Sequence, residues 1–328
     1  VSYPDEDFLD EAPLAASPRR ISVAPSAPVS RHDSVHLPKV IVNESDTHDL
    51  VQDLIAGNEI AFEAIVDDGK RSLGALLAAF PGPIHAEQKP VGSDGPIRAS
   101  ECGPVLKALA AIGQDAVGFI AVRTQDRDPV VRGWATRLLG ELPCGESARN
   151  VGRRVTDKDP DVRRAALAAG RMLLSDENSR SELLRTLIQL AGDARQSEDA
   201  AHAAIEMLAD LREGRAVSAL IDLLNSEYTD IAKSAQWALV VLTRQDFAQD
   251  QAGWKKWWTA NSSRHRIEWL IDALLHEVPE IRRAAGDELK SLTKEYFGYY
   301  DDLPRAERAK AQARYVEWWE SRGKARFR

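Results

Sequence analysis

The sequence predicts an all-α fold, a right-handed solenoid of stacked helical pairs that follows a disordered N-terminal tail. Three observations predict it. A short apolar skeleton recurs five times along the chain, prolines stand at the start of several of these units, and residues 1–46 hold six of the sixteen prolines without any helical or strand period. Self-similarity over tens of residues is typical of helical pairs that bury their apolar faces only by stacking on neighbours.

The repeated unit places an aliphatic residue, an alanine and a leucine on one helical stripe. Its first copy is Val131, Ala135 and Leu142, with Leu138 and Leu139 on the same face. Spacings of three and four residues align with the 3.6-residue period of an α-helix. Four more copies follow, and the intervals between successive copies are 31, 38, 31 and 50 residues. The copies are Val162, Ala166 and Leu173; Ala200, Ala204 and Leu211; Ile231, Ala235 and Leu242; and Ile281, Ala285 and Leu292.

The starts of these helices are marked in the sequence. Asp128-Pro129, Asp159-Pro160 and Val278-Pro279 each precede an apolar stripe. Proline fits the first helical position, and an aspartate before it can accept hydrogen bonds from the free amides. Each unit also has a predicted partner helix upstream, over residues 115–124, 146–155, 181–191, 216–224 and 266–275.

The pattern Asp-Pro-x-Val-Arg-x-x-Ala followed by leucines, found at 128–142 and again from 159, resembles the HEAT repeat. The likeness is to the short form in the bacterial HEAT-like family that includes phycobilin lyases, and it covers roughly residues 103 to 294. It implies an armadillo-like α-solenoid and carries over no catalytic residue, because such repeats serve many unrelated functions. The Trp-rich C-terminal part resembles bacterial HEAT-repeat proteins without a known activity.

Three regions are expected: a tail or linker over 1–46, N-terminal capping helices with a long loop over 47–101, and the solenoid with its Trp-rich insertion and C-terminal helix over 102–328. The helical pattern begins at Thr47. The stretch 81–100 has four prolines and no period, and it is interpreted as either a functional or a mobile loop.

A second duplication covers the C-terminal third. The segment 243–247 leads to Trp254, Trp257 and Trp258, and the matching segment 293–297 leads to Tyr315, Trp318 and Trp319. Large aromatic residues at helical spacing indicate core packing. The alternative is an exposed aromatic groove for an apolar peptide, since tryptophan is common at binding hot spots.

Composition restricts the function. A net charge of −8 argues against nucleic acid as the partner of the whole chain, and the absence of a continuous apolar run argues against a membrane span. Two cysteines cannot form a disulfide framework, so a cytoplasmic protein is expected. His265 and His276 have no metal-spaced partner, and glycines do not cluster as a phosphate loop; neither catalysis, nor a cofactor, nor a metal is predicted.

Arg132, Arg163 and Arg282 occupy one repeat position and form a predicted ladder. A ladder of arginines suits phosphate, but the family resemblance implies structural pairing with Asp128 and Asp159. The final stretch, 303–328, has eight Lys or Arg and three Glu with interleaved aromatics, which is the best local candidate for nucleic acid or a membrane surface.

The function predicted is a non-catalytic scaffold that holds a protein partner on the concave face formed by the second helix of each pair. Two alternatives stay open, a bilin-lyase-like or chaperone-like protein and a nucleic-acid-binding helical array. The provisional partner-binding residues are Arg137, Arg171, Gln236, Asp287, Trp318 and Trp319.

Overall fold

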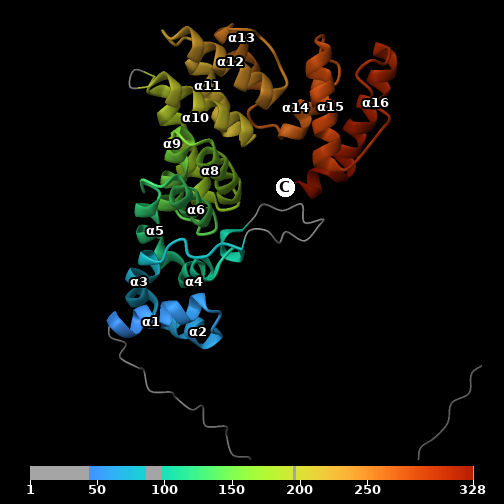
Figure 1. Ribbon diagram of the computed structural model, residues 1–328. Coiled ribbons are helices and arrows are strands. Elements are labelled where there is room, and N and C mark those ends of the chain that lie inside the picture. Colours follow the sequence, from blue (N-terminus) through green and yellow to red (C-terminus); the bar gives the residue numbers. More distant parts are fainter. Residues whose placement is uncertain (1–43, 86–97, 195–196, 328) are drawn as a thin grey trace, which may run out of the picture. The chain divides into compact units, whose positions relative to one another are not determined.

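A computed structural model describes residues 44–85, 98–194 and 197–327, and every regular element among them is helical. Figure 1 shows the helices in chain order. Their bounds are α1 (Glu44–Ile55), α2 (Glu59–Asp68), α3 (Leu73–Ala78), α4 (Pro104–Ile112), α5 (Val117–Arg123), α6 (Pro129–Gly140), α7 (Gly145–Arg153), α8 (Pro160–Leu173), α9 (Glu177–Gly192), α10 (Glu198–Asp210), α11 (Val217–Leu223), α12 (Thr229–Thr243), α13 (Gln251–Asn261), α14 (Arg266–Ala273), α15 (Pro279–Thr293), α16 (Arg305–Trp318) and α17 (Lys324–Arg326).

The repeated units are helical pairs, as the sequence predicts. Each pair has a first helix (α5, α7, α9, α11 and α14) and a second helix that carries the repeated skeleton (α6, α8, α10, α12 and α15). Asp128 and Asp159 cap α6 and α8 by accepting hydrogen bonds from the amides of Val130 and Asp161, both at 2.8 Å. The chain is therefore an all-α repeat solenoid whose helix boundaries follow local sequence signals.

Successive second helices pack closely because small residues meet between them. All five skeleton alanines are buried. A Cβ added to Gly140 of α6 would lie 2.7 Å from the Cα of Ala169 in α8, and one added to Gly170 of α8 would lie 2.6 Å from the methyl carbon of Met207 in α10. The second helices α10 and α12 are also in contact. The second helices thus pack closely in two pairs, α6 with α8 and α10 with α12, and side chains of α10 meet α8 at Gly170.

The buried side chains of the described residues gather into two apolar clusters. The larger runs from Val51 in α1 to Trp254 in α13, and the smaller joins α14, α15, α16 and the C-terminal segment. Val240 of α12 contacts both clusters. The Trp-bearing helix α13, inserted between α12 and α14, separates the last repeat from the others.

Leu292, expected on the buried stripe, is 44% exposed. The other four leucines of the skeleton are buried. The difference arises because α15 is followed by α16, which packs on α14, and no further second helix covers the end of α15. The last copy of the skeleton is therefore incomplete at its leucine.

Residues 104–123 are long and apolar enough to meet the composition criterion for a membrane span, with a mean hydropathy of 1.6. In the sequence, polar residues such as Lys107 and Asp115 interrupt the apolar residues of this stretch. The segment contains α4 and α5 joined by a short 3-10 turn, and its apolar side chains, among them Leu106, Leu109 and Ile120, are buried in the larger cluster. Core packing therefore accounts for its apolar character.

Helix α1 begins at Glu44, three residues before the predicted start of the helical region. Nearly all of the predicted tail, 1–43, and most of the loop, 86–97, lie outside the described residues. The expectations for these two segments stay predictions.

Candidate partner-binding surface

The turns between first and second helices repeat one hydrogen-bonding arrangement. Asp126, Asp157, Ser226 and His276 occupy the same repeat position, and the side chain of each accepts a hydrogen bond from the amide two residues later, at 3.0 to 3.2 Å. Side chains of three different types thus perform one function at this position. The pattern is a turn signature that the sequence does not reveal by residue identity alone.

The predicted arginine ladder is structural. Nη1 of Arg132 donates to the carbonyls of Asp126 and Arg127, that of Arg163 to Asp157 and Lys158, and that of Arg282 to His276 and Glu277, at 2.7 to 3.1 Å. Each arginine thereby satisfies the carbonyls of its own turn. These guanidinium groups are engaged and do not form a free phosphate-binding stripe.

The acid that pairs between repeats is Asp157, and Asp128 and Asp159, expected in that role, are helix caps. Arg132 donates through Nε and Nη2 to the two carboxylate oxygens of Asp157, at 2.9 and 2.7 Å. Burial alone would raise the pKa of Asp157, but the bidentate Arg132 and the amide of Asp159 lower it below its ordinary value. The pair ties α6 to the turn before α8.

A second charged cluster joins the two apolar clusters. Glu288 of α15 pairs with Arg212 after α10, Arg244 after α12 and Arg266 of α14, at 3.4, 3.0 and 2.6 Å. Burial alone would raise the pKa of Glu288, but the hydrogen bond from Arg266 and the three positive charges lower it. One carboxylate therefore connects three consecutive repeats.

The C-terminal duplication is visible in equivalent contacts. Phe247 meets Trp254 edge to face at 5.0 Å, and Phe297 meets Tyr315 in the same way at 4.7 Å. Trp318 and Trp319 are 6% and 4% exposed and belong to the smaller apolar cluster. These side chains pack in the core, where no partner reaches them while the chain is folded.

The exposed side of the second helices α6, α8, α10 and α12 carries a set of side chains, which we call the row face. Its members are brought together in two pairs of helices: α6 packs on α8, and His202 Nδ1 on α10 lies 2.7 Å from Ser234 Oγ on α12. Its residues are Arg137, Arg164, Arg171, His202, Glu206, Lys233 and Trp237.

The predicted contact residues differ in exposure. Arg171 and Asp287 are exposed, whereas Arg137 and Gln236 are partly buried. Gln236 adjoins Trp237, which is 48% exposed and which sequence reasoning missed. Trp237 and Arg137 each follow the skeleton aliphatic residue by six positions. That shared register was the signal that could have identified Trp237.

Asp287 belongs to a different part of the surface. It lines a cavity of about 200 Å³ with Lys290, Tyr296 and Tyr300, and with Tyr299 and Tyr315 of the smaller cluster. The Tyr296 and Tyr300 rings meet edge to face at 5.9 Å, and the Lys290 ammonium lies 5.4 Å from the Tyr296 ring centre. Their hydrogen bond raises the pKa of Tyr296 to about 12.

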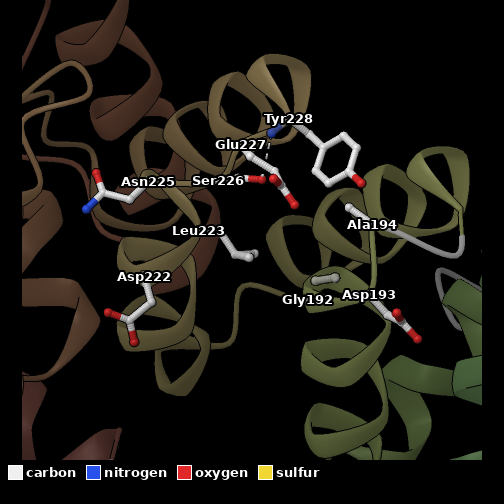
Figure 2. A pocket seen from close by; sticks show the side chains of 10 residues that line it. Gly192, Asp193, Ala194, Asp222, Leu223, Asn225, Ser226, Glu227 and Tyr228 are labelled. Atoms are coloured by element: carbon white, nitrogen blue, oxygen red, sulfur yellow. Dashed lines mark hydrogen bonds between the residues drawn. The ribbon is translucent and has the colours of Figure 1, made fainter.

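A cavity of about 540 Å³ lies between the end of α9 and the turn from α11 to α12. Figure 2 shows Asp193 and Asp222 on opposite sides of it, while Ser226 accepts a hydrogen bond from the Tyr228 amide. Ala191 to Ala194 supply its other wall, and its lining contains no histidine, cysteine or lysine. The cavity therefore lacks a base–nucleophile arrangement.

Metal-binding and thiol chemistry find little support in the described ranges. No group of three His, Cys, Asp or Glu side chains there could hold a metal ion. Cys102 is buried, and burial raises the pKa of its thiol. Cys144 caps α7, where its sulfur accepts the Ser147 amide at 3.4 Å. The raised pKa of Cys102 is the opposite of what a reactive cysteine needs.

Comparisons with known proteins find similarity only among solved structures. No family model matches the chain, and no curated protein matches it. Among solved structures, it is similar to an engineered protein of the Northeast Structural Genomics Consortium, with 18% identity over 76% of this chain and 97% of that one and a TM-score of 0.31. Two designed armadillo repeat proteins, one computationally designed for modular peptide recognition, each show 16% identity, coverage of 75% and 99%, and a TM-score of 0.29. TM-scores this low support no inference about binding.

Proposed function

We propose that the chain is a non-catalytic scaffold that binds a protein partner on its row face, and that its pairs are HEAT-like. The observation that supports this most directly is the exposure of Trp237, a tryptophan that is 48% exposed on α12, the last helix of the row. A surface that carries an exposed tryptophan on one helix and arginines on others has residue types that are common at interface hot spots. The proposal includes that the protein acts in the cytoplasm of a bacterium.

The row also suits an extended partner. Packed helices lie about 8 to 10 Å apart, so each helix offers one set of side chains for every roughly three residues of an extended peptide. A surface of this kind binds by addition of small contacts along its length. Neither the buried Trp318 and Trp319 nor the arginine ladder provides a comparable surface.

Capture of partners from the native source tests the proposal. Arg171→Glu and Trp237→Ser should each remove the same captured protein without lowering the melting temperature, because both side chains are exposed. Matched controls on first helices are Arg153→Glu on α7 and Val122→Ser on α5, where Val122 is 69% exposed. Equal loss of capture in the controls would show that the row face is not the binding surface.

A further inference from the structure

The row face is basic although the chain is acidic. Arg137, Arg164, Arg171 and Lys233 stand against Glu206 and against Asp161 and Asp230, the ion-pair partners of Arg164 and Lys233, which gives the face a charge of four minus three, or +1, within a chain whose net charge is −8. Arg164 pairs with Asp161, and Lys233 with Asp230. Glu206 lies 3.2 Å from His202. The cations left for a partner are Arg137 and Arg171.

Arg137 is the more unusual of the two. Its guanidinium carbon lies 5.8 Å from the Trp134 ring centre, and burial, together with the charge of Arg164, lowers its pKa. No carboxylate of the described residues forms an ion pair with it. A partly buried guanidinium without an anion is held at a cost, because it has lost water and gained no counter-charge.

The close approach of α6 and α8 keeps this arrangement in place. Gly140 packs directly on Ala169, so α6 cannot move away from α8 to relieve the repulsion between Arg137 and Arg164 without opening a buried contact. An anion that enters from outside relieves it instead. A carboxylate suits Arg137, because two parallel hydrogen bonds match the planar guanidinium.

We infer that the partner presents an acidic, extended segment whose carboxylates bind Arg137 and Arg171 and whose apolar side chain contacts Trp237. This inference rests on the proposed function and specifies the partner's chemistry. Arg137 and Arg171 lie on adjacent helices, so the two carboxylates stand roughly three residues apart. Trp237 lies on α12, two helix spacings beyond α8, which places the apolar residue roughly six residues beyond the second carboxylate.

The test uses the full chain and a fluorescein-labelled peptide of glycine and serine with two glutamates and one phenylalanine at these spacings. Fluorescence anisotropy at low salt should show saturable binding. Replacing both glutamates by glutamine should weaken binding at least about tenfold, as should Arg137→Gln or Arg171→Gln in the protein. Arg153→Gln on α7 should leave the affinity unchanged.

Arg137→Lys separates charge from geometry. It keeps the positive charge near Trp134 but cannot form two parallel hydrogen bonds, so it should bind the glutamate peptide more weakly than the wild type and more tightly than Arg137→Gln. Melting temperatures of all variants are measured alongside, and Arg171→Gln, at an exposed position, provides the second test if Arg137 variants unfold.

The outcomes distinguish the two proposals. If the glutamate peptide does not bind, or if the glutamine peptide binds equally well, the inference of an acidic partner is overturned. If Trp237→Ser nevertheless abolishes capture from the native source, the row face remains the proposed binding surface. A peptide with phosphoserine in place of both glutamates that binds at least about tenfold tighter overturns the carboxylate assignment in favour of phosphate. Loss of both peptide binding and row-dependent capture contradicts both proposals.

Discussion

Two glycines of the same helix should respond to alanine with opposite signs. A Cβ on Gly133 of α6 would have Val162 Cγ2 as its nearest neighbour, at 4.0 Å, so Gly133→Ala should stabilise the fold by about 0.5 to 1 kcal/mol through helix propensity. A Cβ on Gly140 would lie 2.7 and 2.8 Å from Ala169 Cα and Cβ, about 1 Å inside normal contact.

Gly140→Ala therefore forces α6 and α8 apart. Overpacking costs about 1 to 3 kcal/mol, and the gain in helix propensity offsets about 1 kcal/mol of it, which leaves a net loss of up to about 2 kcal/mol. Urea unfolding followed by circular dichroism gives both midpoints, with the m-value as a check that the unfolding transition is unchanged. Midpoint shifts of the same sign for the two variants would refute the close packing of the row.

Three further predictions concern the core and its charges. Leu139→Ala, at a fully buried position, should lower the free energy of unfolding by about 2 to 5 kcal/mol in urea titration, whereas Val130→Ala on the exposed side of α6 should change it by about 0.5 kcal/mol or less. Trp318→Ala should cost about 3 to 5 kcal/mol by the same assay, far more than Trp237→Ala, and comparable losses would show that Trp318 is not core. Glu288→Gln should cost about 3 kcal/mol at neutral pH by leaving three arginines without their acid. The pKa of Glu288 is lower in the folded protein than in the unfolded chain, so its stabilisation is present above the ordinary glutamate pKa of about 4.3 and is lost as the pH falls through the folded pKa. Thermal melts should therefore show the difference in melting temperature between wild type and Glu288→Gln shrinking in acid. A difference that does not change with pH would contradict the charge assignment.

The helical pairs could be predicted from the sequence because helix caps and apolar spacing depend only on residues within, or next to, a single helix. Asp128 and Asp159 before their prolines, and the skeleton alanines, are such signals. The exposure of Leu292 was not predictable in this way, since it depends on which helices pack beside the end of α15. The Asp157 partner of Arg132 was missed for a similar reason: the two lie 25 residues apart, and a cap and a pairing acid look alike in sequence.

The proposed binding surface could be predicted only in part from the sequence. The repeat register placed Arg137 and Arg171 off the apolar stripe, but burial decided that Arg137 is a desolvated cation beside Trp134 and that Trp318 and Trp319 are core. Trp237 was not singled out from the sequence, although it follows the skeleton aliphatic residue by six positions, as Arg137 does. How far such a side chain is exposed depends on the packing of neighbouring helices.

Site-specific photo-crosslinking tests the central claim most directly. A photoreactive phenylalanine analogue is placed at Trp237 on the row face or at Val122 on the first helix α5, both exposed positions, and the full chain is irradiated in extract of its native source. A defined crosslinked species from the Trp237 position, absent from the Val122 position and reduced by Arg171→Glu, is the result expected. Equal crosslinking from both positions, or the same species only from Val122, would contradict a partner held on the row of second helices.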